Sequence, residues 1–214
     1  MKESYNILNN HSINKKRRER NLNPANSIWF WSPGGKYNLL QFSDKYNLDG
    51  SVIAAVNLIK GLGICAGLDI IEVEGATGNY HTNYKNKGLA AIDEIKNDKD
   101  FVFVHIEAPD ECGHRGETEN KVKSIEKIDE MIISPIYNYL NNSGLNYKII
   151  VLPDHYTPIS TRTHSSEPVP FLMYHSANKK MTSGIDNFNE YSVNEKSDIF
   201  IKNGYKLLDY LLEL

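Results

Sequence analysis

The sequence predicts an α/β fold built around a mostly parallel β-sheet. Short, nearly continuous apolar runs alternate with longer segments whose apolar residues recur at helical spacing. Continuous rather than alternating apolar runs are typical of parallel strands that are covered on both faces. Their regular alternation with helices from residue 69 onward favours successive βα units over an all-α or an all-β arrangement.

Each element is expected at a definite place along the chain. A polar N-terminal segment precedes the aromatic run Ser27–Trp31 (SIWFW), which predicts a first strand ended by a turn. Further apolar runs predict strands over residues 69–73, 101–106, 148–152 and 169–174. Apolar residues at helical spacing predict helices over residues 51–66, 84–96, 117–140 and 196–212.

The composition is that of an ordinary soluble globular protein. The 214 residues are 40% hydrophobic and 24% charged, and the net charge of −3 suggests neither a nucleic-acid nor a membrane partner. No apolar run approaches the roughly 18–20 residues needed to cross a bilayer. Cys65 and Cys112 provide no disulfide framework, so a cytoplasmic location is expected.

Polar residues with metal-binding chemistry collect where three segments of the predicted sheet end. Asp110 and His114 lie in APDECGHRG after the 101–106 strand, and Asp154 and His155 follow the 148–152 strand. His164 lies in the loop that leads into the 169–174 strand. Since ligands of such sheets bind beyond the carboxyl ends of the strands, we expect these five side chains to share one edge.

Mixed Asp and His ligation favours Zn²⁺ or Mn²⁺ over cations that prefer oxygen-only shells. Five ligands are too many for one catalytic zinc and too few for two metals, which predicts an incomplete two-metal site. Each residue alone has a plainer interpretation. Asp110 could cap a helix, Asp154 and His155 could form a turn, and His164 could be an ordinary surface or core histidine.

Other candidate side chains are less informative. His81, in the glycine-rich loop GATGNYHTNY, could reach a substrate, although an ordinary turn is an equal alternative. His105 is expected to pack within a strand, and His175 ends a strand without a companion motif. Cys112 is interpreted as a packing residue, because no base accompanies it as a nucleophile would require.

Three motifs in order, APDxxGH, PDH and THxxxPVPF, identify a family resemblance. Together with HSINKKR, NPANSIWFW and GSVIAAVNLIKGLG, they resemble the cofactor-independent phosphoglycerate mutases, most closely the archaeal-type branch within the alkaline phosphatase superfamily. The resemblance covers essentially the whole chain. It implies a three-layer αβα sandwich of alkaline phosphatase type, with residues 1–45 as the last part of a lid domain and residues 46–214 as the C-terminal part of the metal-binding core.

The resemblance also implies the roles of individual residues. Asp110, His114 and His164 would bind one divalent metal, and Asp154 and His155 would contribute to a second, with Mn²⁺ or Zn²⁺ expected and Mg²⁺ a further candidate. No 2,3-bisphosphoglycerate would be needed. The family's nucleophilic serine and an N-terminal aspartate belong to a segment that this chain does not display. Asp49-Gly50 precedes an expected helix rather than following a strand, so the chain should be a C-terminal half that is inactive alone.

Basic residues are expected to bind the phosphoryl group and the carboxylate of phosphoglycerate. The candidates are Lys60, Arg162, Arg17 and Lys36, with a solvated helix lysine as the plain alternative for Lys60. The missing N-terminal half is the expected partner. Two other functions stay open, namely another phosphatase or phosphomutase of the same superfamily, and a metal-binding remnant that needs a partner chain.

Overall fold

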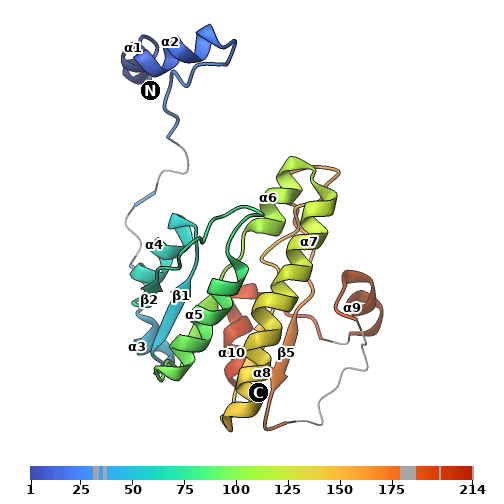
Figure 1. Cartoon of the computed structure of the whole chain (residues 1–214). Coiled ribbons are helices and arrows are strands. Elements are labelled where there is room, and N and C mark those ends of the chain that lie inside the picture. Colours follow the sequence, from blue (N-terminus) through green and yellow to red (C-terminus); the bar gives the residue numbers. More distant parts are fainter. Residues whose placement is uncertain (31–33, 36–37, 179–186, 198, 214) are drawn as a thin grey trace. The chain divides into compact units, whose positions relative to one another are not determined.

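The computed structural model describes residues 1–30, 34–35, 38–178, 187–197 and 199–213, which form two compact units, residues 1–38 and 39–214 (Figure 1). The first unit contains α1 (Lys2–Leu8) and α2 (Ser12–Glu19). The buried amide of Asn14 holds this unit together, because it donates to the carbonyl oxygens of Leu8 and Ala25 and accepts from the Ala25 amide.

The second unit is built on parallel strands. The central strand β1 (Gly50–Ile53) pairs in parallel with β2 (Asp69–Ile71) on one side and with β3 (Phe101–Val104) on the other. A separate antiparallel pair consists of β4 (Lys148–Val151) and β5 (Leu172–His175). The α/β class with a parallel sheet is therefore confirmed.

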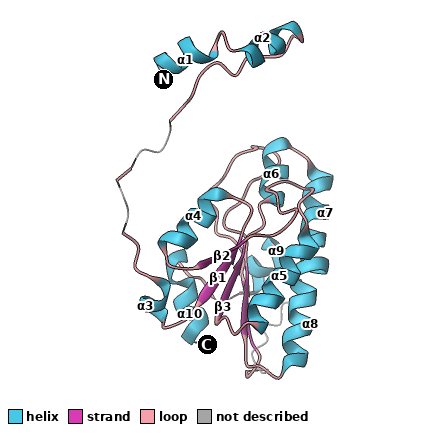
Figure 2. Cartoon of the chain, turned by 60° about the vertical axis from the view of Figure 1, so that its left-hand side comes forward, coloured by secondary structure: helices cyan, strands magenta, loops and turns pink. Residues whose placement is uncertain are grey.

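Helices cover both sides of these strands, which gives three layers (Figure 2). On one side lie α4 (Asn57–Cys65) and α10 (Leu207–Glu213); on the other lie α5 (Tyr84–Lys96), α7 (Thr118–Ile128) and α8 (Ser134–Ser143). The shorter elements are α3 (Phe42–Tyr46), α6 (Ala108–Arg115), α9 (Glu190–Lys196) and a 3₁₀ turn (Gly204–Lys206). In the part of the chain that is described, no helix has the length and apolar character of a membrane crossing.

Two predicted helices are confirmed. Helix α5 covers the expected residues 84–96. The helix expected over 117–140 is a continuous helical stretch over 118–143, in which the π-helical turn Asp129–Ile133 joins α7 to α8. A β-carbon at Gly88 of α5 would lie 2.5 Å from the Met131 carbonyl oxygen, so only glycine permits α5 and this turn to approach so closely.

The prediction of a helix over residues 51–66 is wrong for its first third. Residues 50–53 form β1, and the helix begins only at Asn57. All four residues of β1 are buried between two neighbouring strands, and such a fully buried strand has no alternation that distinguishes it from a buried helix turn. Asp49-Gly50 therefore precedes a strand and not a helix.

Three other boundaries differ from expectation. Residues 27–30 form no strand, and Trp31 lies outside the described residues. The 169–174 strand begins only at Leu172, because Pro168 and Pro170 lack the amide that a ladder requires. The helix expected over 196–212 is replaced by α9, a 3₁₀ turn that begins at Gly204, and α10.

Lys99 links the amino ends of β1 and β2 through two ion pairs. Its ammonium nitrogen lies 2.7 Å from a carboxylate oxygen of Asp49, just before β1, and 2.6 Å from one of Asp69, at the start of β2. These contacts raise the pKa of Lys99 and lower that of Asp49. Asp49 therefore forms an ion pair at the amino end of the sheet, whereas the predicted metal ligands follow the carboxyl ends of the strands.

A small apolar cluster supports those strand ends. Tyr84 of α5, Ala108 of α6 and Ile132 of the π-helical turn are buried against one another. Partly buried side chains that pack on them are Val104, Ile106, Ile128, Met131 and Ile136. The cluster fixes the start of α6, the helix that carries Asp110 and His114.

Candidate metal centre

Asp110 and His114 lie on one face of α6, because residues four apart in an α-helix are neighbours. The segment APDECGHRG is expected to lie in a loop after the 101–106 strand, and this expectation is wrong because residues 108–115 form a helix. The segment carries helix signals: proline near the first helical position, acidic residues in the first turn, and Gly116 in the left-handed conformation at the C-terminus. Proline and glycine, which suggested a loop, here mark the beginning and the end of helix α6.

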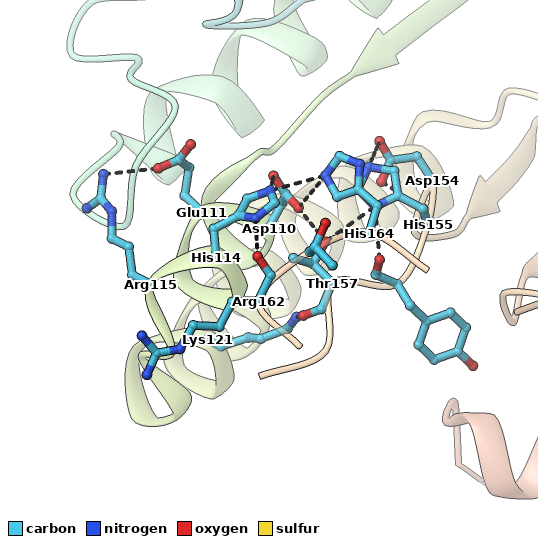
Figure 3. Close-up of polar contacts among 12 residues, drawn as sticks. Asp110, Glu111, His114, Arg115, Lys121, Asp154, His155, Thr157, Arg162 and His164 are labelled. Atoms are coloured by element: carbon cyan, nitrogen blue, oxygen red, sulfur yellow. Dashed lines mark hydrogen bonds and ion pairs between the residues drawn. The ribbon is translucent and has the colours of Figure 1, made fainter. Parts of the chain in front are cut away.

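The segment between β4 and β5 brings the remaining candidates to the same place. An isolated antiparallel bridge joins Tyr156 to Ser165, with the Ser165 amide 3.2 Å from the Tyr156 carbonyl oxygen. The bridge places His155 and His164 side by side, and their ring centroids lie 3.7 Å apart. Figure 3 shows these rings beside Asp110 and His114.

Asp110, His114 and His164 form a compact group of three potential ligands, whose ligand atoms all lie within 4.8 Å of one another. Nε2 of His114 lies 3.1 Å from Nε2 of His164. The two carboxylate oxygens of Asp110 divide between the rings, with Oδ2 3.3 Å from His114 Nε2 and Oδ1 3.3 Å from His164 Nε2. Asp110 is largely shielded, whereas His164 is half exposed.

The backbone of Arg162 sets the tautomer of His114. Its carbonyl oxygen lies 2.9 Å from His114 Nδ1, and a carbonyl can only accept. In the neutral ring the proton therefore sits on Nδ1, and the lone pair of Nε2 faces Asp110 and His164. This is the arrangement by which outer partners orient metal-binding histidines. Arg162 itself has a left-handed backbone, with φ of 54°.

Thr157 holds the carboxylate of Asp110. The Thr157 hydroxyl donates to Asp110 Oδ1 and lies 3.3 Å from His155 Nδ1, and its side chain is buried. The Thr157 carbonyl oxygen in turn accepts a 2.7 Å hydrogen bond from the ammonium group of Lys121. A β-carbon at Gly113 would lie 2.6 Å from that oxygen, so glycine permits this close approach of the loop to α6.

Asp154 and His155 form a second pair beside the first group. His155 Nε2 lies 3.3 Å from Asp154 Oδ2. On the other side of the ring, Nδ1 lies 3.3 Å from the Tyr156 carbonyl oxygen, which assigns the proton of a neutral ring to Nδ1. His155 therefore also turns an unprotonated nitrogen toward a carboxylate. The exposed Asp154 lies at the outer side of the site.

The donor set fits a divalent metal. Ligands that bind one ion at roughly 2.0–2.2 Å lie about 3–3.5 Å from one another, which is the range found among Asp110, His114 and His164. Two imidazole nitrogens and a carboxylate suit Zn²⁺ or Mn²⁺. Without a cation, lone pairs of two neutral imidazoles and a carboxylate would face one another at short range.

The predicted substrate-binding residues lie in several places. Lys60 of α4 forms a 2.6 Å ion pair with Glu72, just beyond β2. The guanidinium of Arg162 packs against Gly116, at the end of α6. Arg17 lies in the first unit and donates to the Asn23 carbonyl oxygen, and Lys36 lies outside the described residues. The substrate roles of all four stay predictions.

The other singled-out side chains are explained by local structure. The His81 backbone is held in a turn by Asn79, and its side chain is exposed. Cys112 is buried inside α6, and burial raises the pKa of its thiol, as a packing role requires. His105 lies one residue beyond β3 rather than within it, and burial lowers its pKa.

Two residues that support the predicted ligands, Thr157 and Lys121, are not predicted from the sequence. Thr157 lies only two residues after His155, and this proximity is the signal that could have marked it. Lys121 has no such signal, because it belongs to α7 and meets Thr157 only in the folded protein. Thr157 contacts the predicted ligand Asp110, and Lys121 contacts Thr157, so both support predicted ligands without being among them.

The fold and this donor set are those of an α/β domain with a candidate metal site, and the sequence assigns the chain to a family. Residues 5–199 match the Metalloenzyme superfamily, and the chain belongs to it. This agrees with the α/β architecture and with the cluster of Asp110, His114 and His164.

Comparison with individual proteins shows which members of the superfamily the chain resembles. The chain is 48% identical over 196 residues to a 2,3-bisphosphoglycerate-independent phosphoglycerate mutase of Methanosarcina mazei, covering 92% of this chain and 49% of that protein. Among solved structures it is similar to the PH0037 protein from Pyrococcus horikoshii, with a TM-score of 0.83, 28% identity and coverage of 99% of this chain and 54% of that one. A cofactor-independent phosphoglycerate mutase from Thermoplasma acidophilum gives a TM-score of 0.61, with 26% identity and coverage of 99% and 49%.

The predicted resemblance to cofactor-independent phosphoglycerate mutases is thereby confirmed. The chain spans about half the length of these relatives.

Proposed function

We propose that this chain supplies the C-terminal, metal-binding half of a 2,3-bisphosphoglycerate-independent phosphoglycerate mutase. The complete enzyme would interconvert 3- and 2-phosphoglycerate through a phosphoserine. One observation carries the proposal. Asp110 and His114 meet His164, which lies 50 residues beyond His114, in a chain 48% identical to such a mutase over 196 residues.

Two divalent ions, Mn²⁺ or Zn²⁺ with Mg²⁺ a further candidate, would be held at this end of the sheet. Asp110, His114 and His164 would hold one ion, and Asp154 with His155 would contribute to the other. Bound divalent ions neutralise charge on a transferring phosphoryl group and lower the pKa of a hydroxyl nucleophile. The Arg162 carbonyl and the Thr157 hydroxyl would keep the ligands aligned.

The lid, the substrate contacts and the nucleophile are proposed to come from other segments. Residues 1–45 would belong to a lid domain, and residues 46–214 to the core. Arg162, Lys60, Arg17 and Lys36 are the proposed contacts to the phosphate and the carboxylate of the substrate. The nucleophilic serine would come from an N-terminal half, so the chain alone would not turn over substrate.

The test has two stages. Titration of the purified chain with Mn²⁺ or Zn²⁺ should show binding that His114→Ala removes. The chain is then assayed on 3-phosphoglycerate alone and with the N-terminal half of the Methanosarcina mazei relative. Turnover should appear only in the mixture.

Three outcomes would contradict parts of the proposal. Absence of metal binding would overturn the metal site. Turnover by the chain alone would overturn its assignment as an inactive half. A mixture that hydrolyses a simple phosphate ester but leaves 3-phosphoglycerate unchanged would favour a phosphatase over a mutase.

A further inference from the structure

Lys87 of α5 carries its ammonium group inside the protein. Its side chain is fully buried, with 0% exposure, and Nζ donates to the His105 carbonyl oxygen at 3.3 Å. Burial lowers the pKa of Lys87 to about 8, against the opposing effect of the Glu107 carboxylate. Near neutral pH the group is therefore still mainly a cation, and burying a cation is costly unless it has partners.

The partners of Lys87 lie in the connection between β3 and α6. The His105 amide donates to the Ile53 carbonyl oxygen of β1 at 2.9 Å, and the His105 carbonyl accepts from Lys87. The connection is thus attached to the central strand on one side and to α5 on the other. Three residues beyond Glu107 comes Asp110.

Glu107 adds a further negative charge close to the metal centre. Burial raises the pKa of Glu107, and the carboxylates of Glu111 and Asp110 raise it further, whereas Lys87 lowers it. The carboxylate lies against Gly78, where an added β-carbon would come within 2.6 Å of its Oε2. A buried cation beside this acidic group offsets its charge.

We propose that Lys87 is a positioning residue for the metal centre. By holding the His105 carbonyl and balancing the Glu107 carboxylate, it fixes the turn from β3 into α6 and so aims Asp110 and His114 at His164. The inference rests on the metal site of the proposed function and adds a residue, from a different helix, that touches none of the ligands.

The experiment compares Lys87→Met with Lys85→Met, an identical substitution at an exposed position of the same helix. Both variants and the wild-type chain are titrated calorimetrically with Mn²⁺, and circular dichroism checks the fold. We expect Lys87→Met to weaken binding about tenfold, at the lower end of the roughly 10–100-fold contributed by outer partners of metal ligands. Lys85→Met should bind within about twofold of the wild type.

Charge balance is tested by the double variant Lys87→Met, Glu107→Gln. If Lys87 acts by offsetting Glu107, removing both charges should restore part of the lost affinity, which a general loss of packing would not do. The absorption spectrum of bound Co²⁺ reports the geometry of the ligands. It should therefore change shape in Lys87→Met and recover toward the wild-type shape in the double variant.

The outcomes separate this inference from the proposed function. A wild-type chain that binds no metal would overturn both. A wild type that binds, with Lys87→Met binding equally well, would overturn the role of Lys87 alone. Should Lys87→Met fail to fold, the double variant decides: weak but measurable binding supports the role, and failure of that variant to fold would show that Lys87 serves folding instead.

Discussion

Nε2 of His114 lies 3.1 Å from Nε2 of His164, although 50 residues separate the two histidines in the sequence. The Arg162 carbonyl accepts from Nδ1 of His114, so Nε2 carries no proton in the neutral ring. Both rings lie against the carboxylate of Asp110. The pair joins helix α6 to the loop between β4 and β5.

Replacing His114 should remove metal binding. His114→Ala deletes one ligand and leaves Asp110 and His164, which cannot complete the group. We expect affinity for Mn²⁺ or Zn²⁺ to fall by more than the roughly 10–100-fold typical of outer partners. His81→Ala, at an exposed turn, is the matched control and should bind like the wild type. Equal affinities for the two variants would contradict the assignment.

Removing the Thr157 hydroxyl should weaken metal binding without unfolding the protein. Thr157→Val keeps the side-chain shape but leaves Asp110 Oδ1 without its donor. We expect affinity to fall roughly 10–100-fold, with Thr157→Ser close to wild type. Thr161→Val, in an exposed part of the same loop, is the control. A loss of affinity in Thr157→Ser as large as in Thr157→Val would argue against the hydroxyl.

Gly113→Ala should destabilise the protein by about 1–3 kcal/mol, the usual cost of overpacking. The new β-carbon would lie 2.6 Å from the Thr157 carbonyl oxygen and 2.8 Å from its methyl group. Gly61→Ala, on α4 with nothing within 4 Å of its β-carbon, should instead stabilise by roughly 0.5–1 kcal/mol. Urea unfolding measures both. Effects of the same sign would contradict the predicted contact.

Lys87 should make stability depend on pH above neutrality. Its pKa is lowered to about 8 in the folded protein, from an ordinary value of 10.5, so the unfolded chain binds more protons between these limits. The free energy of unfolding should therefore rise with pH across this window, by up to about 1.4 kcal/mol per pH unit. The measurement is the difference between wild type and Lys87→Met in urea at pH 7.5, 9 and 10. A constant difference would contradict the lowered pKa.

The sequence indicated the candidate ligands but not the local structure that presents them. Asp110, His114 and His164 are predicted as ligands because strand ends of a parallel sheet meet at one edge. That Asp110 and His114 lie on a helix was missed, since proline and glycine also mark loops. Strand β1 was mistaken for a helix, because four fully buried residues show no periodicity.

Contacts between distant segments were not predictable in the same way. The bond from Lys87 to the His105 carbonyl and the support of Asp110 by Thr157 depend on the packing of α5 and of the β4–β5 loop. Lysine and threonine are ordinary residues of helices and loops, so their types carry no signal by themselves. Their roles follow only from burial and from the atoms that they meet.

The meeting of α6 with the 155–164 loop has a thermodynamic consequence. A cation bound by side chains from both segments would close a loop of about fifty residues, and the unfolded chain could not hold it in the same way. Metal concentration would then enter the folding equilibrium by mass action, raising the midpoint of thermal unfolding as the ion is added. A chelator would thus act on this protein as a mild denaturant.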